Sequence, residues 1–456
     1  MNISIHPKKI TSAFLFVLFC LMANITRAGD TVKYSLMSLD SAIAMGLAHS
    51  YQVKLSGDRL TEIESSFADI KNRALPSVSL SAGYTRVSNI PTEYFVFPGS
   101  PEEIPSTALF PVILNNYSAT ASLRESLFNG FLLKYATMNM QYREKSAEYS
   151  LQNNENDVRL EVISTYLALF QLQQAHYLVM QTLQQMAAHV KEVSAFATHG
   201  LATQNDVLRV KLEESNTKLK EIDIYNQLLT VNYNMNILLG LPDSNVIDID
   251  SATILAPKNI MPLPYYLQKA TENRADLNAL AMQKNAAETA VKETKSQLYP
   301  KLNIMADYNY LRPNPRVIPP LDQFQRTWDA GVEITYNLTD LYNNKNKTDV
   351  SRAQLAETEA EFAELSDNVK MEINQSYLQY KQSIEKIEVA QKSLEQAQEN
   401  YKLVKSRYDN HVALITDLTD ANNYLFNARI SLISAKADAE QAYYNLLKSA
   451  GELNTK

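Results

Sequence analysis

The chain has 456 residues, a formal net charge of −7, a single cysteine and only ten glycines. This acidity argues against nucleic acid as a partner, because nucleic acids are bound by basic surfaces. One cysteine excludes a disulfide framework and a cysteine-based metal cluster. The scarcity of glycine, beside abundant Ala, Leu, Gln, Glu and Lys, favours long helices over an enzyme built from loops.

The first 28 residues have the pattern of a secretory signal peptide. A basic pair at 8–9 precedes an apolar run over 13–23, and Ala28 ends a segment typical of a cleavage site. Cleavage would remove Cys20 and three positive charges, which changes the formal net charge from −7 to −10. Lipid attachment to Cys20 is the less favoured alternative, because a bulky phenylalanine precedes it. No later apolar run is long enough for a membrane helix, so a membrane crossing would have to use strands.

The chain contains a tandem duplication. Residues 38–84 match 262–308 at an offset of 224, and residues 117–240 match 328–451 at an offset of 211. The offsets differ because the first copy is 13 residues longer between its two matched parts, and such an insertion belongs in an exposed loop. The predicted organisation is a signal peptide over 1–28, a first repeat over 29–240, a linker over 241–262 and a second repeat over 263–456.

Each repeat is predicted to contain a helix, a strand, a loop, a strand, a very long helix, a turn and a final helix. The opening helices are expected from about Leu39 to Arg73 and from about Leu263 to Leu298, each ending before a proline that cannot continue it. The linker is expected to be a joint without chemistry. The predicted strands cover 77–87 and 117–128 in the first repeat, and 301–310 and 328–338 in the second.

Apolar and polar side chains alternate along all four predicted strands. A period of two places one kind of side chain on each face of a sheet. A strand that crosses an outer membrane has this pattern, with the apolar face toward lipid, and so does a half-buried strand of a soluble domain. The strands alone do not separate these two interpretations. In a membrane sheet the lipid-facing residues would include Val78, Leu80, Leu302, Ile304, Val332 and Ile334.

Loops and long helices complete each repeat. The loops over 90–116 and 311–326 contain nine of the 16 prolines and are expected to be exposed, either as an external recognition surface or without a role. From about Leu341 to Tyr408 there is no proline or glycine, and apolar residues recur about every 3.5 positions, as in a coiled coil. The first repeat has an equivalent helix from about Phe131 to Thr198. Helices of this length extend about 100 Å and need partners to bury their apolar side.

No sequence pattern points to catalysis or to a bound cofactor. The chain has no glycine-rich phosphate loop and no HExxH zinc motif, and its histidines lack metal-ligand spacing. His199 and His411 lie at the expected helix turns and titrate near neutral pH in principle, although solvated turn residues are the simpler interpretation. We therefore expect no catalytic residue, no metal and no cofactor.

The order of these features resembles the TolC-like outer membrane efflux proteins over essentially the whole chain after the signal. The strand entries Leu75-Pro76 and Tyr299-Pro300 contribute to the resemblance, together with the duplication and the alternating strands. Two helix-turn motifs complete it: His199-Gly200-Leu201 followed by Asp206-Val207-Leu208, and Tyr408-Asp409-Asn410-His411 followed by Asp417-Leu418. Each motif is short, but their order within two aligned copies is specific.

The resemblance implies a homotrimer that is mainly α-helical. Each protomer would give four strands to one shared 12-stranded β-barrel in the outer membrane, continued by a long coiled-coil α-barrel in the periplasm. The implied function is a passive exit duct of a tripartite efflux pump or a type I secretion system, with a periplasmic adaptor, an inner-membrane transporter and outer membrane lipid as partners. The alternative from another class is a periplasmic coiled-coil scaffold without a channel, which needs no apolar strand face.

The resemblance also assigns residues at the two helix turns. It implies that Asp417 and Asp420 form aspartate rings in a gate, although acids at a helix start are also favoured by the helix dipole alone. The network that closes the gate would contain Asp206, Asn205 and Tyr408. The tips that dock on an adaptor would contain Gly200, Leu201, His411 and Val412. Ala413 departs from the family pattern, because some members have an arginine there that closes the gate.

Overall fold

The computed structural model describes residues 34–89, 91, 93–96, 98–99, 102–105, 111–250, 258–410 and 412–453. The predicted signal peptide and His411 lie outside these residues. The chain forms two compact units. The first unit comprises Met1–Ser50, Val158–Asn259 and Gln379–Tyr444, and the second comprises Tyr51–Asp157, Ile260–Leu378 and Asn445–Lys456.

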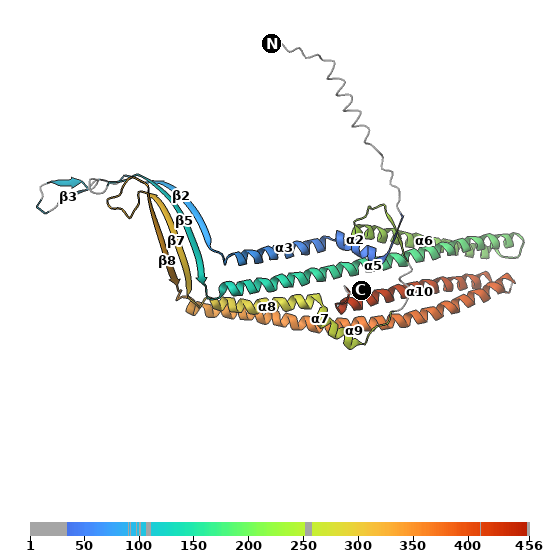
Figure 1. The fold of residues 1–456 in the computed structure, drawn as a ribbon. Helices are drawn as coiled ribbons and strands as arrows, with labels where there is room; N and C mark the ends of the chain where they lie inside the picture. Colours follow the sequence, from blue (N-terminus) through green and yellow to red (C-terminus); the bar gives the residue numbers. More distant parts are fainter. Residues whose placement is uncertain are drawn as a thin grey trace, which may run out of the picture. The chain divides into compact units, whose positions relative to one another are not determined.

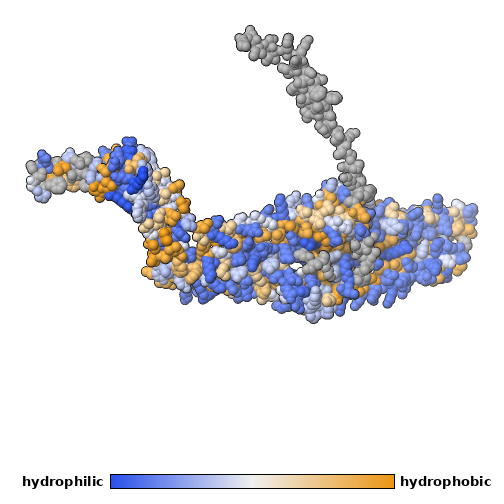
Figure 2. All heavy atoms as spheres, viewed as in Figure 1, coloured by the Kyte–Doolittle hydropathy of each residue, from blue (hydrophilic) through white to orange (hydrophobic). Residues whose placement is uncertain are grey.

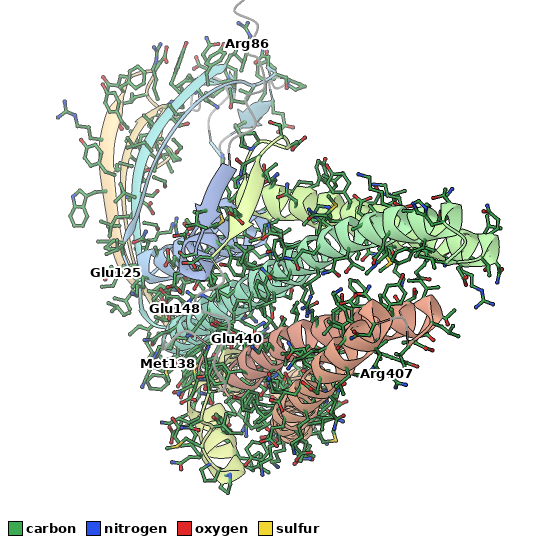
Figure 3. The ribbon with its side chains drawn as sticks, turned by 90° about the vertical axis from the view of Figure 1, so that its right-hand side faces the viewer. Arg86, Glu125, Met138, Glu148, Arg407 and Glu440 are labelled. Atoms are coloured by element: carbon green, nitrogen blue, oxygen red, sulfur yellow. The ribbon has the colours of Figure 1, made fainter. Side chains whose placement is uncertain are left out.

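The second unit contains a four-stranded antiparallel sheet in the order β2-β5-β7-β8 (Figure 1). Its strands are β2 (Ser77–Arg86), β5 (Asn115–Phe128), β7 (Lys301–Arg312) and β8 (Gln325–Thr335). The four predicted strands are therefore present, and the two repeats meet where β5 pairs with β7. Figure 3 shows Arg86 and Glu125 toward opposite ends of this curved sheet. Within the first loop, β3 (Tyr94–Val96) pairs with β4 (Glu103–Pro105).

Each strand of the sheet is joined to one helix. The helices next to β2, β5, β7 and β8 are α3 (Tyr51–Asn72), α5 (Leu132–Thr198), α8 (Ala275–Ser296) and α9 (Asp340–Asp409). A hydrophobic cluster in this unit brings α7 (Leu263–Asn273) and α8 together with α9 and the end of α10 (Ile415–Ser449). Its fully buried members include Ile373, Leu446 and Ala450. The long helices thus bury their apolar side against neighbours, as their 3.5-residue period predicts.

The first unit is mainly helical and also contains a short parallel sheet. Its helical parts are α2 (Leu39–His49), α6 (Gln204–Leu239) and segments of α5, α9 and α10. Strand β1 (Tyr34–Met37) pairs with β6 (Val246–Ile249) of the linker, and the buried Tyr166 hydroxyl donates to the Met37 carbonyl oxygen at 2.9 Å. Lys258 of the linker forms an ion pair with the buried Glu440. The linker, expected to be a joint between the repeats, is also a packed part of this unit.

Both opening helices are interrupted, where the sequence predicts continuous ones. Ser50 separates α2 from α3 and Arg274 separates α7 from α8, with extended ψ angles of 119° and 118°. These positions are 224 residues apart, so they are equivalent in the duplication. A glycine at the end of each repeat lies against the interruption: Gly240 packs on His49, and Gly451 packs on the backbone of Arg274. The interruption is therefore an inherited feature of the repeat.

Within the described ranges, no helix is sufficiently long and apolar to cross a membrane.

Candidate functional site

The four-stranded sheet has one apolar and one polar face. Residues directly opposite one another in neighbouring strands point to the same side of a sheet. One row of directly paired residues across the four strands consists of Leu80, Ala121, Tyr308 and Trp328. The next row, which points to the opposite face, consists of Ser79, Ser122, Asp307 and Asp329. The register therefore keeps the alternation of the individual strands in phase across both repeats.

All six residues predicted to face lipid share the apolar face, because the register pairs Leu302 with Ile334 and Ile304 with Val332 and keeps the first repeat in phase. This face is exposed in the single chain: the exposed fraction is 83% for Leu80 and 65% for Val332. Apolar side chains gather over the strands in Figure 2. A contiguous apolar surface of this kind marks a contact with protein or membrane rather than with water.

Aromatic side chains lie near both ends of the sheet. At the end near Arg86, the Tyr84 and Tyr117 ring centroids are 5.0 Å apart, and Phe324 stacks on Tyr310 at 4.8 Å. At the opposite end, Phe131 contacts Phe128 and Tyr299 edge to face. Tyrosine and tryptophan are enriched where a protein passes through the two surfaces of a bilayer. The aromatic residues are thus placed as two belts flanking an apolar band.

The helix turns of the two repeats pack against each other in the first unit. The turn between α5 and α6 and the turn between α9 and α10 lie at the same end of these helices (Figure 1). Their shared cluster consists of Val193, Val207, Val210, Tyr408, Ile415 and Leu418. Asn423 of α10 also donates to the Glu213 carboxylate of α6 at 2.9 Å. We call this paired end the helical tips.

Asp206 and Asp417 have equivalent positions at the helical tips. The Thr203 amide and hydroxyl donate to Oδ2 of Asp206 at 2.9 and 2.6 Å, and the Asp206 amide donates back to Thr203 Oγ1 at 3.2 Å. The Leu414 amide donates to Oδ2 of Asp417 at 3.0 Å. Both carboxylates therefore satisfy amides at a helix start. The sequence Thr203-x-x-Asp206 is the pattern of a capping box, a signal for this cap that the turn motifs do not include.

The cap on α6 makes the stability of this helix start pH-dependent. Hydrogen bonds from the Thr203 hydroxyl and amide hold the pKa of Asp206 below its ordinary value. The bonds stabilise the ionised form, so their contribution is complete above the ordinary pKa of aspartate and is lost as the pH falls through the lowered pKa. We expect Thr203→Ala to destabilise the first turn of α6 by about 1 kcal/mol at neutral pH, measured as faster amide hydrogen exchange at 204–208. The difference from the unmodified chain should shrink at low pH, and a difference independent of pH would contradict this role of Asp206.

The other predicted tip residues have distinct surroundings. Tyr408 is buried in the shared cluster, and burial, with nearby acids including Asp206, raises its pKa to about 12. The hydroxyl therefore remains protonated and available as a donor. Asp420 is exposed and lines, together with Arg209, a groove of about 440 Å³ between α6 and α10. Asp417 and Asn205 are also exposed.

The predicted docking residues that the structure describes are open to solvent. Gly200 has a φ angle of +73°, and nothing lies within 4 Å of the position a Cβ atom would occupy. The exposed fractions are 71% for Leu201 and 67% for Val412. Among the described residues, no three His, Cys, Asp or Glu side chains are grouped to hold a metal ion.

Comparison with known proteins identifies the family. The sequence profile of the outer membrane efflux proteins matches residues 62–241 and 266–452, one match for each repeat. A search of curated protein sequences gives no significant match.

Solved structures share the fold. The outer membrane protein VceC from Vibrio cholerae is 17% identical with a TM-score of 0.73, covering 91% of this chain and 96% of VceC. The Campylobacter jejuni CmeC outer membrane channel is 14% identical with a TM-score of 0.75, covering 91% and 86% of the two chains. The open Neisseria gonorrhoeae MtrE outer membrane channel is 13% identical with a TM-score of 0.70, covering 91% and 89%. The fold, the duplication and the family profile lead to one conclusion: this chain belongs to the outer membrane efflux protein family and is an outer membrane protein of mainly helical structure.

Proposed function

We propose that the protein is the outer-membrane exit duct of a tripartite efflux pump or a type I secretion system, and that it conducts cargo passively and has no enzymatic activity. The proposal depends on one observation: the strand register places the apolar residues of all four strands on one exposed face and polar residues on the other. A strand that lines a water-filled pore needs lipid on one side and a polar lumen on the other.

Assembly into a trimer is part of the proposal. In one chain β2 and β8 are edge strands with a single neighbour each. Unpaired edges cannot remain in a bilayer, where every backbone amide and carbonyl group must be hydrogen-bonded. Four strands are too few to close a barrel, since the smallest membrane barrels have about eight. Pairing β8 of one copy with β2 of the next removes both edges, and three copies give the 12 strands that the family resemblance implies.

The helical tips are proposed as the gate and the docking surface. The exposed Asp417 and Asp420 would form aspartate rings where three copies meet, while Asp206, Asn205 and Tyr408 would belong to the closing network. Gly200, Leu201 and Val412, with His411 outside the described residues, would contact a periplasmic adaptor that also engages an inner-membrane transporter. Support comes from the exposure of the two aspartates of the proposed rings and of the described docking residues, and from the packing of both tips in one cluster.

A periplasmic scaffold without a channel remains the alternative from another class. A scaffold would account for the long helices, but it gives no reason for an apolar sheet face flanked by aromatic residues at both ends. The two functions therefore differ in what the strands must do, and a conductance measurement separates them.

We expect the purified protein to conduct ions across a planar lipid bilayer with a preference for cations. Because exposed carboxylates near a pore attract cations, changing Asp417 and Asp420 together to Asn should lower the cation-to-anion permeability ratio by about twofold or more. Asp417→Asn also weakens a helix cap, so Thr203→Ala, which weakens the equivalent cap and leaves every carboxylate in place, is the matched control. A protein that inserts but never conducts would contradict the duct, and an unchanged permeability ratio would contradict the aspartate rings.

A further inference from the structure

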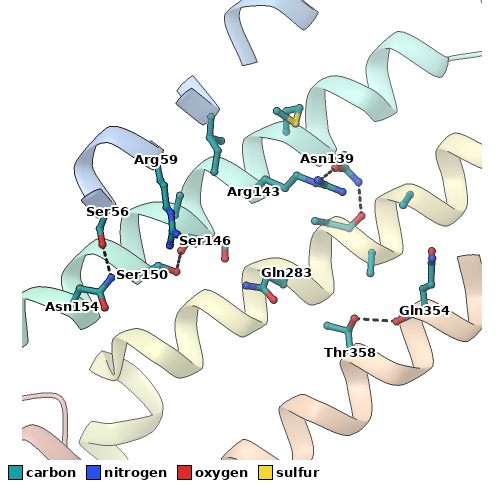
Figure 4. Close-up of a pocket in the computed structure, with 16 residues that line it drawn as sticks. Ser56, Arg59, Asn139, Arg143, Ser146, Ser150, Asn154, Gln283, Gln354 and Thr358 are labelled. Carbon is teal, nitrogen blue, oxygen red and sulfur yellow. Dashed lines mark hydrogen bonds between the residues drawn. The ribbon is translucent and has the colours of Figure 1, made fainter. Parts of the chain in front are cut away.

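A cavity in the second unit is lined by residues that belong neither to the sheet nor to the helical tips. Its volume is about 580 Å³, which is in the range of pockets for small organic ligands. Helices α3, α5, α8 and α9 all contribute to its wall (Figure 4). We propose that this cavity binds a small organic anion, a carboxylate or sulfonate attached to an apolar body.

Two arginines supply the positive charge of the cavity. Arg59 extends from α3 toward Ser146 and Ser150 of α5, and Arg143 projects from α5 itself (Figure 4). Among the described residues, neither guanidinium forms an ion pair at contact distance, whereas Arg73 on α3 is paired with Asp69 at 2.9 Å. The half-buried Glu293 is the carboxylate that interacts with the charge of Arg143. In a chain with an acidic net charge, two arginines that line one cavity, with a single carboxylate near one of them, are a local excess of positive charge.

Arg143 is held in place by a buried side chain. Asn139 is 6% exposed, and its amide nitrogen donates to the Ala286 carbonyl oxygen of α8 at 2.8 Å. Its oxygen accepts a hydrogen bond from Nε of Arg143 at 2.7 Å. This bond uses only one of the five N–H groups of the guanidinium, and the two terminal nitrogens donate no hydrogen bond within the described part of the chain. A planar pair of donors fixed in this way suits a carboxylate or sulfonate.

The remaining wall of the cavity has an apolar part and a polar part. Ala147 of α5 and Ala286, Ala287 and Ala290 of α8 leave space between the helices, and Met140 adds a flexible apolar surface. The polar part offers hydroxyl and amide groups from Ser56, Ser146, Ser150, Asn154, Gln283, Gln354 and Thr358. The cavity therefore matches an amphipathic anion, whose charged group meets the arginines while its apolar body covers the alanines. A fully hydrated inorganic anion would leave this apolar part of the wall unused.

The test is binding of 4-(trifluoromethyl)benzoate, followed by ¹⁹F NMR, to the full-length protein in lipid nanodiscs. The neutral probe 4-(trifluoromethyl)benzamide has nearly the same shape and lacks the charge. We expect saturable binding of the benzoate, with the benzamide at least about tenfold weaker, because a charge-assisted hydrogen bond contributes about 1.5–3 kcal/mol. Arg59→Gln and Arg143→Gln should each weaken benzoate binding by about tenfold.

Arg73→Gln is the matched control, since it removes an arginine of the same charge that is paired and lies outside the cavity wall. It should leave benzoate affinity unchanged, and circular dichroism should show the same helix content and melting temperature for all three variants. The proposal is overturned if the benzoate does not bind saturably, as when assembly covers the cavity. It is also overturned if benzamide binds equally well, or if Arg59→Gln and Arg143→Gln bind like Arg73→Gln.

Discussion

Gly451→Ala is expected to destabilise the protein by about 3 kcal/mol, and Gly240→Ala by about 2 kcal/mol. Both glycines have positive φ angles, +73° and +68°, which cost a residue with a Cβ about 1 kcal/mol or more. A Cβ at Gly451 would lie 2.8 Å from the backbone of Asn273 and Arg274, which cannot move without disturbing the helix interruption. At Gly240 the obstacle is the His49 side chain at 2.4 Å, which can rotate away at a smaller cost.

Gly200→Ala is the control that separates strain from contact. Gly200 has the same φ angle of +73° as Gly451 but faces open space. It should therefore lose only the contribution of the backbone strain, about 1 kcal/mol. Thermal unfolding of the three variants in detergent, followed by circular dichroism, should rank Gly451→Ala below Gly240→Ala and Gly240→Ala below Gly200→Ala in melting temperature. Equal melting temperatures would mean that the close approach of Gly240 and Gly451 to the helix interruptions does not contribute to the stability of the protein.

The strands were predictable because the alternation of apolar and polar residues lies within each strand and occurs in both repeats. Alternation over about ten residues fixes which side chains share a face, and the duplication repeats the test in a second segment. The family resemblance then supplied what the pattern left open, namely which of two kinds of sheet the strands form. The register confirms that one face is apolar, from Leu80 across to Trp328.

The helix interruptions at Ser50 and Arg274 were not predictable from local sequence, because neither position has a glycine or a proline. They are accompanied by contacts with Gly240 and Gly451, which are distant in sequence. The packing of the linker was likewise not predictable from local sequence, since the pairing of β6 with β1 depends on residues far upstream. At the tips, the Thr203-x-x-Asp206 pattern signals the cap at Asp206, whereas Leu414 gives no such signal for the cap at Asp417. Their proposed role in a gate depends on neighbouring copies, so neither the sequence pattern nor one chain displays it.

Gly200→Arg is expected to abolish export while the protein still assembles and inserts in the outer membrane. The position is exposed at the tip between α5 and α6, with no neighbour to clash with, so a long side chain fits in the isolated chain. If this tip is covered by an adaptor, the arginine must either prevent close approach or be buried without a partner. An uncompensated buried charge costs about 3–5 kcal/mol, which corresponds to a loss of affinity of about 100-fold or more.

Export of a fluorescent dye from cells that depend on this protein measures the effect, and crosslinking to the adaptor measures docking directly. Gly200→Ala is again the matched control, because it has the same backbone strain and lacks the bulk and charge of arginine. We expect Gly200→Ala to export and crosslink normally, and Gly200→Arg to fail in both while its amount in the outer membrane is unchanged. Normal export by Gly200→Arg would place the docking surface elsewhere and leave the proposed duct intact. Failure of both variants would instead assign the loss to backbone strain at the turn, because strain is what the two substitutions share.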